Sequence, residues 1–223
     1  MYYSSTRKSL EAKNKTNDRH GQGMFVTFEG IEGCGKTTQI TLLANWLRER
    51  RQSVCVTYEP GDTELGKYLR NLLLSPEFSP SKATELLLYL ADRAEHVRKV
   101  IIPAIQRGEV VLCDRYHDST VAYQCYGRGI NIEFTELSLK YLEFPIPNIT
   151  FLLDCPVEIG LERLKNRPLD RMEKEALSFH HRVRKGFLKL ARKYPERIKV
   201  IDATQRKEHI QNQIRSLILK YGL

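Results

Sequence analysis

The sequence lacks the marks of membrane-spanning, exported and disulfide-stapled chains. No apolar run among its 223 residues approaches the length that crosses a bilayer. Its five cysteines are odd in number and contain no C-x-x-C pair, so they indicate neither a disulfide framework nor a zinc site. We therefore expect a protein of the reducing cytoplasm, with no membrane association.

Residues 1–23 lack the apolar central stretch of a signal peptide and are rich in Ser, Thr, Lys and Asn. This composition predicts a disordered N-terminal extension. A transit peptide is the alternative, which the acidic residues of the segment disfavour. No linker or internal repeat follows, so residues 24–223 are predicted to form one domain.

Acidic residues are too few to balance the basic ones. The 36 Lys and Arg outnumber the 27 Asp and Glu, which gives a net charge of +9, and residues 1–23 supply +3 of it (five basic minus two acidic). The remainder suits a protein that handles anionic ligands. A nucleic-acid surface is the rival interpretation, but the basic residues are dispersed and no nucleic-acid motif accompanies them, so no nucleic-acid partner is expected.

Short apolar runs alternate with segments of helical periodicity, which predicts an α/β fold with a parallel sheet covered on both faces. Ligands of such sheets bind at the carboxyl ends of the strands, so the segments that follow the first three runs should share one edge. The strand-like runs are 25–28, 54–58, 110–113, 149–153 and 199–201, and the helical patterns lie at about 36–50, 64–74, 82–107, 116–127, 133–143, 156–166, 172–193 and 206–221.

The pattern Gly30-x-x-x-x-Gly35-Lys36-Thr37 stands between the first strand-like run and a helical pattern. This spacing is typical of a phosphate-binding loop, in which glycines let successive backbone N–H groups surround an anion. Lys36 would reach the β- and γ-phosphates, and the Thr37 hydroxyl would hold Mg²⁺. The sequence therefore predicts a nucleoside triphosphate site.

Asp114 and Arg115 end the third strand-like run. An aspartate there can hold Mg²⁺ as the second acidic partner of a phosphate loop, and an arginine offers a planar fork for a phosphate. The alternative is a surface pair that caps a helix.

The segment DRYHDSTVAYQCYGRG, residues 114–129, resembles the bacterial thymidylate kinases, and the resemblance extends over residues 24–221. It includes FEGIEGCGKTTQ at 28–39, EPG at 59–61, ADRAEHV at 91–97, LDRME at 169–173 and VIDA at 200–203. The resemblance implies a P-loop fold of the nucleoside monophosphate kinase type, three layers α/β/α with a five-stranded parallel sheet. It also implies transfer of the γ-phosphoryl group of ATP to dTMP with Mg²⁺, in a homodimer.

Residue chemistry agrees with such a reaction. A nucleoside monophosphate arrives largely as a dianion, so its phosphorylation needs cations that bring two anions into line rather than a general base. Five basic residues are available for this, with no obvious base beside them: Lys36, Arg70, Arg115, Arg167 and Arg171.

The resemblance carries roles onto matching positions. For ATP these are Gly30, Gly33, Cys34, Gly35, Lys36, Thr37 and Thr38; for dTMP they are Glu32, Glu59, Arg70, Tyr89, Arg93, Arg115, Thr120, Tyr123 and Gln124; for the metal they are Thr37, Asp114 and Glu59. Within the dTMP set, Glu32 would meet the 3′-hydroxyl, Tyr89 would stack on thymine and Arg93 would donate to thymine O4. A solvated loop acid is the alternative for Glu32, and a core aromatic for Tyr89.

The segment RLKNRPLDR, within a lid at about 163–175, would close over ATP. The phosphate loop has no base between Ile31 and Cys34, so the lid is expected to supply the catalytic arginine. Arg171 is the first choice and Arg167 the second, while a basic loop without function is the alternative. Catalytic roles are thus expected for Lys36, Arg115, Arg171 and Arg167.

Three positions depart from the family pattern: Tyr58 stands for an arginine, and Asp62 and Cys125 each stand for a glycine. A carboxylate at Asp62 should repel the acceptor phosphate unless it points away or meets a cation. Two other functions stay open, a P-loop deoxynucleoside kinase and a non-catalytic P-loop nucleotide-binding protein. A nucleoside kinase would need a base near the 5′-hydroxyl, for which Glu59 is the one candidate.

Overall fold

A computed structural model describes residues 23–223, so residues 1–22, nearly all of the predicted extension, lie outside the described residues. The core is one parallel sheet with strand order β2-β3-β1-β4-β5. This confirms the prediction of a five-stranded parallel sheet. The strands are β1 (Met24–Glu29), β2 (Val54–Tyr58), β3 (Val110–Asp114), β4 (Ile149–Asp154) and β5 (Ile198–Asp202).

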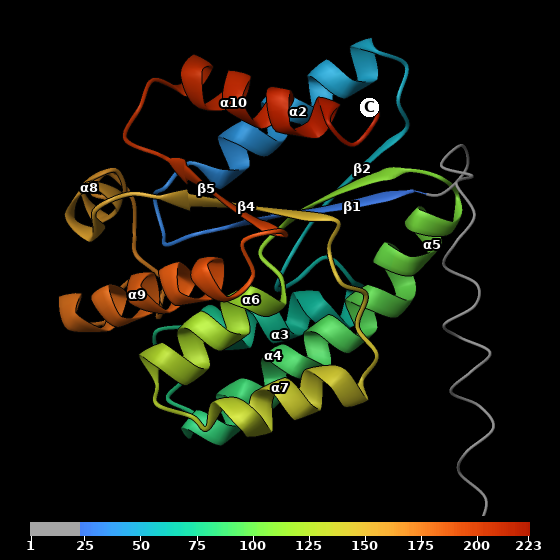
Figure 1. Cartoon of the computed structure of the whole chain (residues 1–223). Coiled ribbons are helices and arrows are strands. Elements are labelled where there is room, and N and C mark those ends of the chain that lie inside the picture. The colour runs from blue at the N-terminus through green and yellow to red at the C-terminus, as the bar shows by residue number, and fades with distance from the viewer. Residues whose placement is uncertain (1–22) are drawn as a thin grey trace, which may run out of the picture.

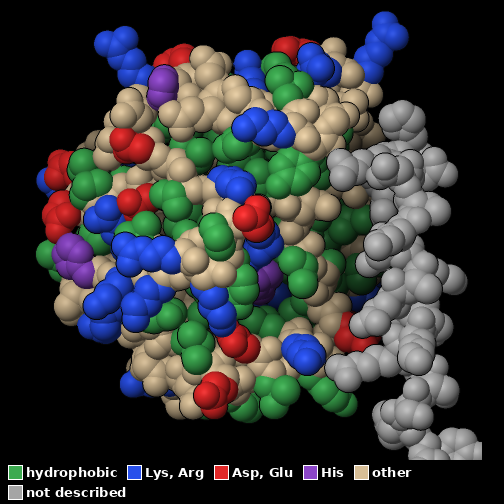
Figure 2. Space-filling model, in the orientation of Figure 1, with side chains coloured by type: hydrophobic (Ala, Val, Ile, Leu, Met, Phe, Trp, Pro, Cys, Tyr) green, Lys and Arg blue, Asp and Glu red, His purple; other side chains and the backbone are tan. Residues whose placement is uncertain are grey.

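Helices cover both faces of the sheet (Figure 1), which completes the predicted three layers. On one face α2 (Lys36–Glu49) packs with α10 (Lys207–Leu219). The other helical segments are α3 (Glu64–Leu74), α4 (Lys82–His96), η1 (Val97–Ile101), α5 (Ile102–Gln106), α6 (His117–Thr120), η2 (Val121–Gly127), α7 (Ile132–Tyr141), α8 (Val157–Glu162) and α9 (Leu177–Lys193). Figure 2 shows Lys and Arg side chains gathered over α9 on the face that it draws.

The central strands are apolar along their whole length because both of their faces are covered. All six residues of β1 are buried, whereas β2 and β5 at the sheet edges are only partly buried. Side chains of β1 alternate between layers: Val26 and Phe28 join the main core cluster, and Phe25 joins a second cluster with Tyr116. The sheet is thus a rigid frame for the loops at its ends.

The strand register brings the carboxyl ends of β1, β2 and β3 to one level. Phe28 and Tyr58 each lie opposite Asp114 in the ladders. The phosphate loop, the segment from Glu59 and the segment from Asp114 therefore leave the sheet side by side, as the sequence predicts.

Two predicted helices are irregular. The pattern at 82–107 divides into α4, the π-helical η1 and α5, and the pattern at 116–127 divides into α6 and the π-helical η2. Pro103 stands at the start of α5 and has no N–H for an α-helical bond to Lys99, so the regular ladder is interrupted there. The pattern at 172–193 becomes helical only from Leu177, because the lid occupies its beginning.

Candidate active site

The loop between β1 and α2 depends on glycine. Gly30, Gly33 and Gly35 have φ values of 139°, 70° and 94°, which side chains rarely tolerate. A Cβ on Gly33 would also lie 2.0 Å from the carbonyl oxygen of Gly160 on α8. The loop can therefore turn into the start of α2 and pack closely against α8 only because these positions are glycine.

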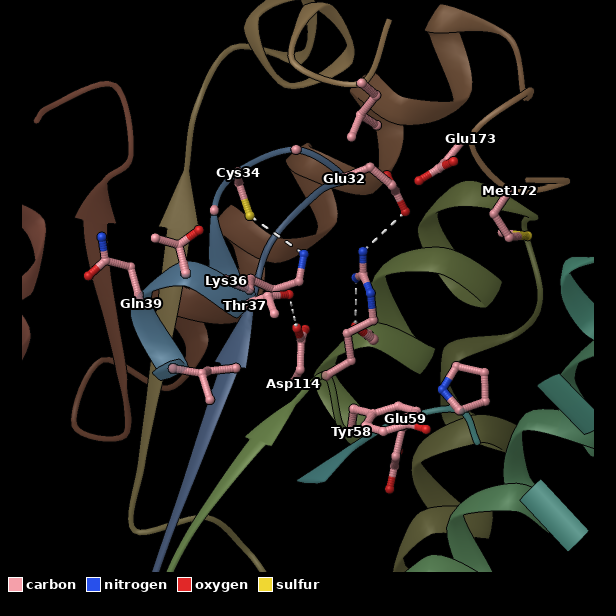
Figure 3. A pocket seen from close by; sticks show the side chains of 18 of the residues that line it. Glu32, Cys34, Lys36, Thr37, Gln39, Tyr58, Glu59, Asp114, Met172 and Glu173 are labelled. Carbon is pink, nitrogen blue, oxygen red and sulfur yellow. Dashed lines mark hydrogen bonds and ion pairs between the residues drawn. The ribbon is translucent and has the colours of Figure 1, made fainter. Parts of the chain in front are cut away.

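Lys36 and Thr37 at the start of α2 face the cleft, as Figure 3 shows. Lys36 Nζ donates to the carbonyl oxygens of Ile31 at 3.0 Å and Gly30 at 3.3 Å, and lies 3.6 Å from Cys34 Sγ. The Thr37 hydroxyl donates to Asp114 Oδ2 at 2.9 Å. The predicted donor-site residues thus come together.

Thr37 and Asp114 fit a magnesium ion. They offer hard oxygen ligands, and Mg²⁺ is usually held by one or two protein groups together with phosphate oxygens and water. No trio of His, Cys, Asp or Glu side chains within residues 23–223 is arranged to hold a metal ion. Thr37 and Asp114 would therefore share the ion with the phosphates of a bound nucleotide. They would not enclose it with protein ligands alone.

Glu59, the third predicted metal ligand, is committed elsewhere. Its Oε2 accepts from Arg93 Nε at 2.7 Å and its Oε1 accepts from His96 Nδ1 at 2.8 Å. Burial raises the pKa of Glu59, but Arg93 and His96 outweigh burial and hold that pKa below its usual range. Glu59 is therefore an ionised carboxylate of the cleft wall that is held by Arg93 and His96.

Asp62 extends this buried network. The Thr57 hydroxyl donates its one proton to Asp62, so it can only accept from Nε2 of His96. Nδ1 of His96 faces the carboxylate of Glu59, so the imidazole bridges Thr57 and Glu59. Asp62 is thus held by the Thr57 hydroxyl at the end of this network.

The other two departures from the family pattern, Tyr58 and Cys125, each contact a neighbouring side chain. The guanidinium of Arg70 lies 5.4 Å from the centre of the Tyr58 ring, within cation–π range. The Cys125 thiol is buried and donates to the Thr135 hydroxyl at 3.3 Å.

An ion pair joins the phosphate loop to the segment after β3. Arg115 has a φ of 70°, unusual for a residue with a side chain, and its guanidinium turns back over the loop. Its Nη1 donates to Gly30 O at 3.0 Å and to Ser119 Oγ at 3.2 Å, and its Nη2 donates to Glu32 Oε1 at 3.1 Å. The Tyr123 hydroxyl donates to the same oxygen. Glu32 is therefore a held carboxylate and not a solvated loop acid.

The electrostatics of Glu32 follow from these partners. Burial raises the pKa of its carboxyl, but His180, Arg115, Lys36 and Tyr123 together lower it to about 2. Glu32 is thus ionised at any ordinary pH and can only accept hydrogen bonds.

The predicted base-binding residues line one end of the cleft. Arg93 is 2% exposed and uses three of its five N–H groups on Glu59, on the Thr120 hydroxyl at 2.6 Å and on the carbonyl oxygen of Tyr116 at 2.9 Å. Two donors remain for a ligand. Tyr89 is half-buried in the cleft wall and Arg70 donates to Pro60 O at 2.6 Å.

Glu85, a buried residue on α4, gathers the groups around it. It accepts from Gln124 Nε2 at 3.1 Å, from Arg128 Nε at 3.0 Å and from Arg171 Nη1 at 2.7 Å. Arg171 also donates from Nε to Leu73 O at 2.7 Å. These bonds hold Arg171 against α3 and α4, so the first-choice catalytic arginine does not line the cleft, whereas Arg167 does.

The lid has its own internal ties. Arg167 donates through both Nη groups to Glu173, and Asp170 N–H donates to Glu173 Oε2 at 3.0 Å. Arg163 Nη1 donates to Gly33 O at 3.1 Å, which connects the lid to the phosphate loop. Figure 3 shows Glu173 and Met172 on the side of the cleft that Glu32 faces.

Sequence reasoning missed several residues of this site. Glu85 lies one helical turn before Tyr89, so helical spacing could have placed it beside the site. Glu173 lies within the motif LDRME, which could have marked it as well. His96 lies within ADRAEHV and Arg163 begins RLKNRPLDR, so these motifs held a signal as well. His180 carried none, since its place near Glu32 depends on contacts with a distant segment.

One cleft of about 1070 Å³ brings the predicted residues together. It is lined by the phosphate loop, the carboxyl ends of β2 and β3, α4, η2 and the lid. Of the predicted site residues, all line it except Gly30 and Arg171. A phosphate loop after β1 of a parallel sheet, with an acidic residue after β3 and a basic lid, defines a P-loop kinase of the nucleoside monophosphate type.

Comparison with known proteins gives the family. A family model described as thymidylate kinase matches residues 28–214. A thymidylate kinase of Carboxydothermus hydrogenoformans is 47% identical over 202 residues, 88% of this chain and 97% of the relative. One of Gloeobacter violaceus is 49% identical over 200 residues, 87% of this chain and 94% of the relative. The chain belongs to the thymidylate kinase family.

A solved structure agrees with this assignment. The crystal structure of thymidylate kinase from Ehrlichia chaffeensis matches with a TM-score of 0.75 at 35% identity and covers 89% of this chain and 99% of that one. Within residues 23–223, none of the helices combines the length and the apolar character needed to span a membrane.

Proposed function

We propose that the chain transfers the γ-phosphoryl group of ATP to dTMP with Mg²⁺, giving dTDP and ADP. The observation that carries the proposal is the position of Arg115. It lines the cleft between the phosphate loop, which would hold ATP, and η2, which would line the side that holds dTMP. Family membership supports the same reaction.

The donor half would hold ATP by its phosphates. Gly33 to Thr38 form the end of the loop and the first turn of α2, and the positive N-terminal end of this helix favours anions. Lys36 would exchange its bonds to the loop carbonyls for bonds to phosphate oxygens. Thr37 and Asp114 would hold Mg²⁺, which neutralises charge that develops during the transfer.

The acceptor half would hold dTMP at both ends. Arg70 and Arg115 supply positive charge for its phosphate, and Glu32 and Tyr123 lie where the sugar would pass. At the base, Gln124 gives its N–H to Glu85, so its carbonyl oxygen is left to accept from thymine N3–H. Arg93 has donors left for thymine O4, a position at which cytosine carries a donor itself.

The state of Glu59 disfavours a nucleoside kinase. That activity would need a base to take the proton of a 5′-hydroxyl, and Glu59 was the one candidate. Both of its oxygens are engaged by Arg93 and His96. A monophosphate acceptor needs no such base.

The five cysteines of the chain are free thiols, four of them buried. This supports our proposal that the enzyme works in the reducing cytoplasm.

Acceptor choice tests the function directly. ADP release should depend on dTMP, and dCMP should be used at least about a hundredfold less efficiently because its amino group would face the Arg93 donors. Removal of one methyl group costs about 0.8 kcal/mol, so dUMP should lose only about fourfold in kcat/KM. Steady-state assays with dTMP, dUMP, dCMP and thymidine measure this. ADP release that is indifferent to the acceptor, or equal use of dCMP, would refute the proposal.

We propose Arg167 rather than Arg171 as the lid arginine that stabilises the transferring phosphoryl group. Arg167 faces the cleft and is half-exposed, whereas Arg171 is bound to Glu85 and Leu73. Arg167→Ala should lower kcat by about a thousandfold with little change in either KM. Arg171→Ala should mainly lower the melting temperature, because it leaves Glu85 short of a partner. The reverse pattern, with Arg171→Ala losing more kcat at an unchanged melting temperature, would contradict this assignment.

We further propose a homodimer formed through α3 and α4, which pack against each other. Leu65, Tyr68 and Leu72 form an exposed apolar stripe on α3, and Leu87 of α4 is 58% exposed. Sedimentation should give twice the 25.9 kDa mass of the chain. Tyr68→Glu should give a monomer, while Val200→Glu on the edge strand β5 should stay dimeric. A monomeric wild-type protein would contradict the dimer, and a dimeric Tyr68→Glu variant would contradict this interface.

A further inference from the structure

His180 on α9 is a buried polar side chain whose one contribution to the site so far is to lower the pKa of Glu32. It is 0% exposed, and within residues 23–223 neither of its ring nitrogens has a hydrogen-bond partner. A buried polar group left unpaired costs about 1–3 kcal/mol, so such groups are rare in folded proteins. A role for the imidazole would account for its position.

The nearest charged group is Glu32 of the phosphate loop. His180 Nδ1 lies 3.5 Å from Glu32 Oε2, and this carboxylate oxygen is also buried and unpaired among the described residues. An approach of about 0.5 Å would bring the two atoms to hydrogen-bond distance. Since Glu32 is ionised and can only accept, Nδ1 must carry the proton.

The two oxygens of Glu32 have different surroundings. Oε1 accepts from Tyr123 and Arg115, which line the cleft, whereas Oε2 is buried toward His180. The Glu32 side chain is 10% exposed, and that exposure is not at Oε2. A ligand hydroxyl would therefore meet Glu32 from the side opposite His180.

The surroundings of His180 tie it to the same wall of the cleft. Its neighbour Phe179 packs edge-on against the Tyr123 ring, with centroids 6.1 Å apart, and Arg128 lies over Phe179. Helix α9 packs along η2, which carries Tyr123, and begins directly after the lid. His180 thus connects the phosphate loop to the helix that follows the lid.

We propose that His180 is a positioning residue for the acceptor site. Its Nδ1 holds Oε2 of Glu32 from behind, so that Oε1 stays with Tyr123 and Arg115 on the side where the acceptor sugar binds. The inference rests on the proposed role of Glu32 as the group that meets the 3′-hydroxyl of dTMP. It predicts that His180 matters for acceptors that carry this hydroxyl and not for those that lack it.

Three substitutions separate the hydrogen bond from packing. His180→Phe keeps a ring and removes both nitrogens. His180→Asn places an amide N–H near the position of Nδ1, and His180→Gln places one near that of Nε2. The measured quantities are kcat and KM for dTMP and for its 3′-deoxy analogue, with melting temperature as the check on folding.

His180→Phe should raise the KM for dTMP about tenfold, as expected for one lost bond to a charged group, with kcat within about twofold. Its kinetics with the 3′-deoxy analogue should match those of the wild type. His180→Asn should stay within about threefold of the wild type for both acceptors. If His180→Phe does not fold, His180→Gln decides, since it should lose dTMP affinity as His180→Phe would.

Equal losses for both acceptors, or no rescue by His180→Asn, would overturn the inference and reduce His180 to a packing role. Glu32→Gln separates this failure from that of the proposed function. If Glu32→Gln abolishes the preference for dTMP over the analogue while the His180 variants keep it, Glu32 retains its role and the inference about His180 is wrong. A wild-type enzyme without that preference would overturn the role of Glu32, and the inference with it.

Discussion

The ion pair between Arg115 and Glu32 is the contact on which the site depends. It joins two segments that leave neighbouring strands, the phosphate loop after β1 and the chain after β3. Arg115 reaches it from a left-handed backbone conformation, which costs about 1–3 kcal/mol and is offset by bonds to Gly30, Ser119 and Glu32. Arg115 therefore ties the phosphate loop to the segment that follows β3.

Buried carboxylates organise the rest of the cleft in the same way. A kinase that brings two anionic substrates together needs several cations, and these repel one another unless acidic groups separate them. Glu59 holds Arg93 and His96, Glu85 holds Arg128 and Arg171, and Glu173 holds Arg167. Each arginine is thereby fixed in direction before a substrate binds, which lowers the reorganisation needed during the reaction.

Much of this molecule can be predicted from its sequence. Apolar runs alternating with helical patterns predict the parallel sheet, and glycine spacing with Lys36 and Thr37 predicts the donor loop, because these signals are local. Which of Arg167 and Arg171 lines the cleft could not be predicted. Both are basic residues of one short segment, and what separates them is the bond of Arg171 to Glu85, which lies 86 positions away in the chain.

The same limit applies to Glu59, Asp62 and His180. Motif position suggests a metal ligand for Glu59 and a repulsive charge for Asp62, yet both belong to a buried network built around His96. His180 lies in an unremarkable helical pattern and gains meaning only from the packing of α9 near the phosphate loop. These contacts join segments that are far apart in the chain, so a single sequence does not reveal them.

The most direct test of the account is a double-mutant cycle across Glu32 and Arg115. The kcat/KM for dTMP would be measured for the wild type, Glu32→Gln, Arg115→Lys and the double variant. If the pair positions both halves of the cleft as one unit, the losses should be non-additive by at least about 1.4 kcal/mol, a factor of ten. Losses that add to within about 0.5 kcal/mol would show that the two residues act independently and would contradict the account.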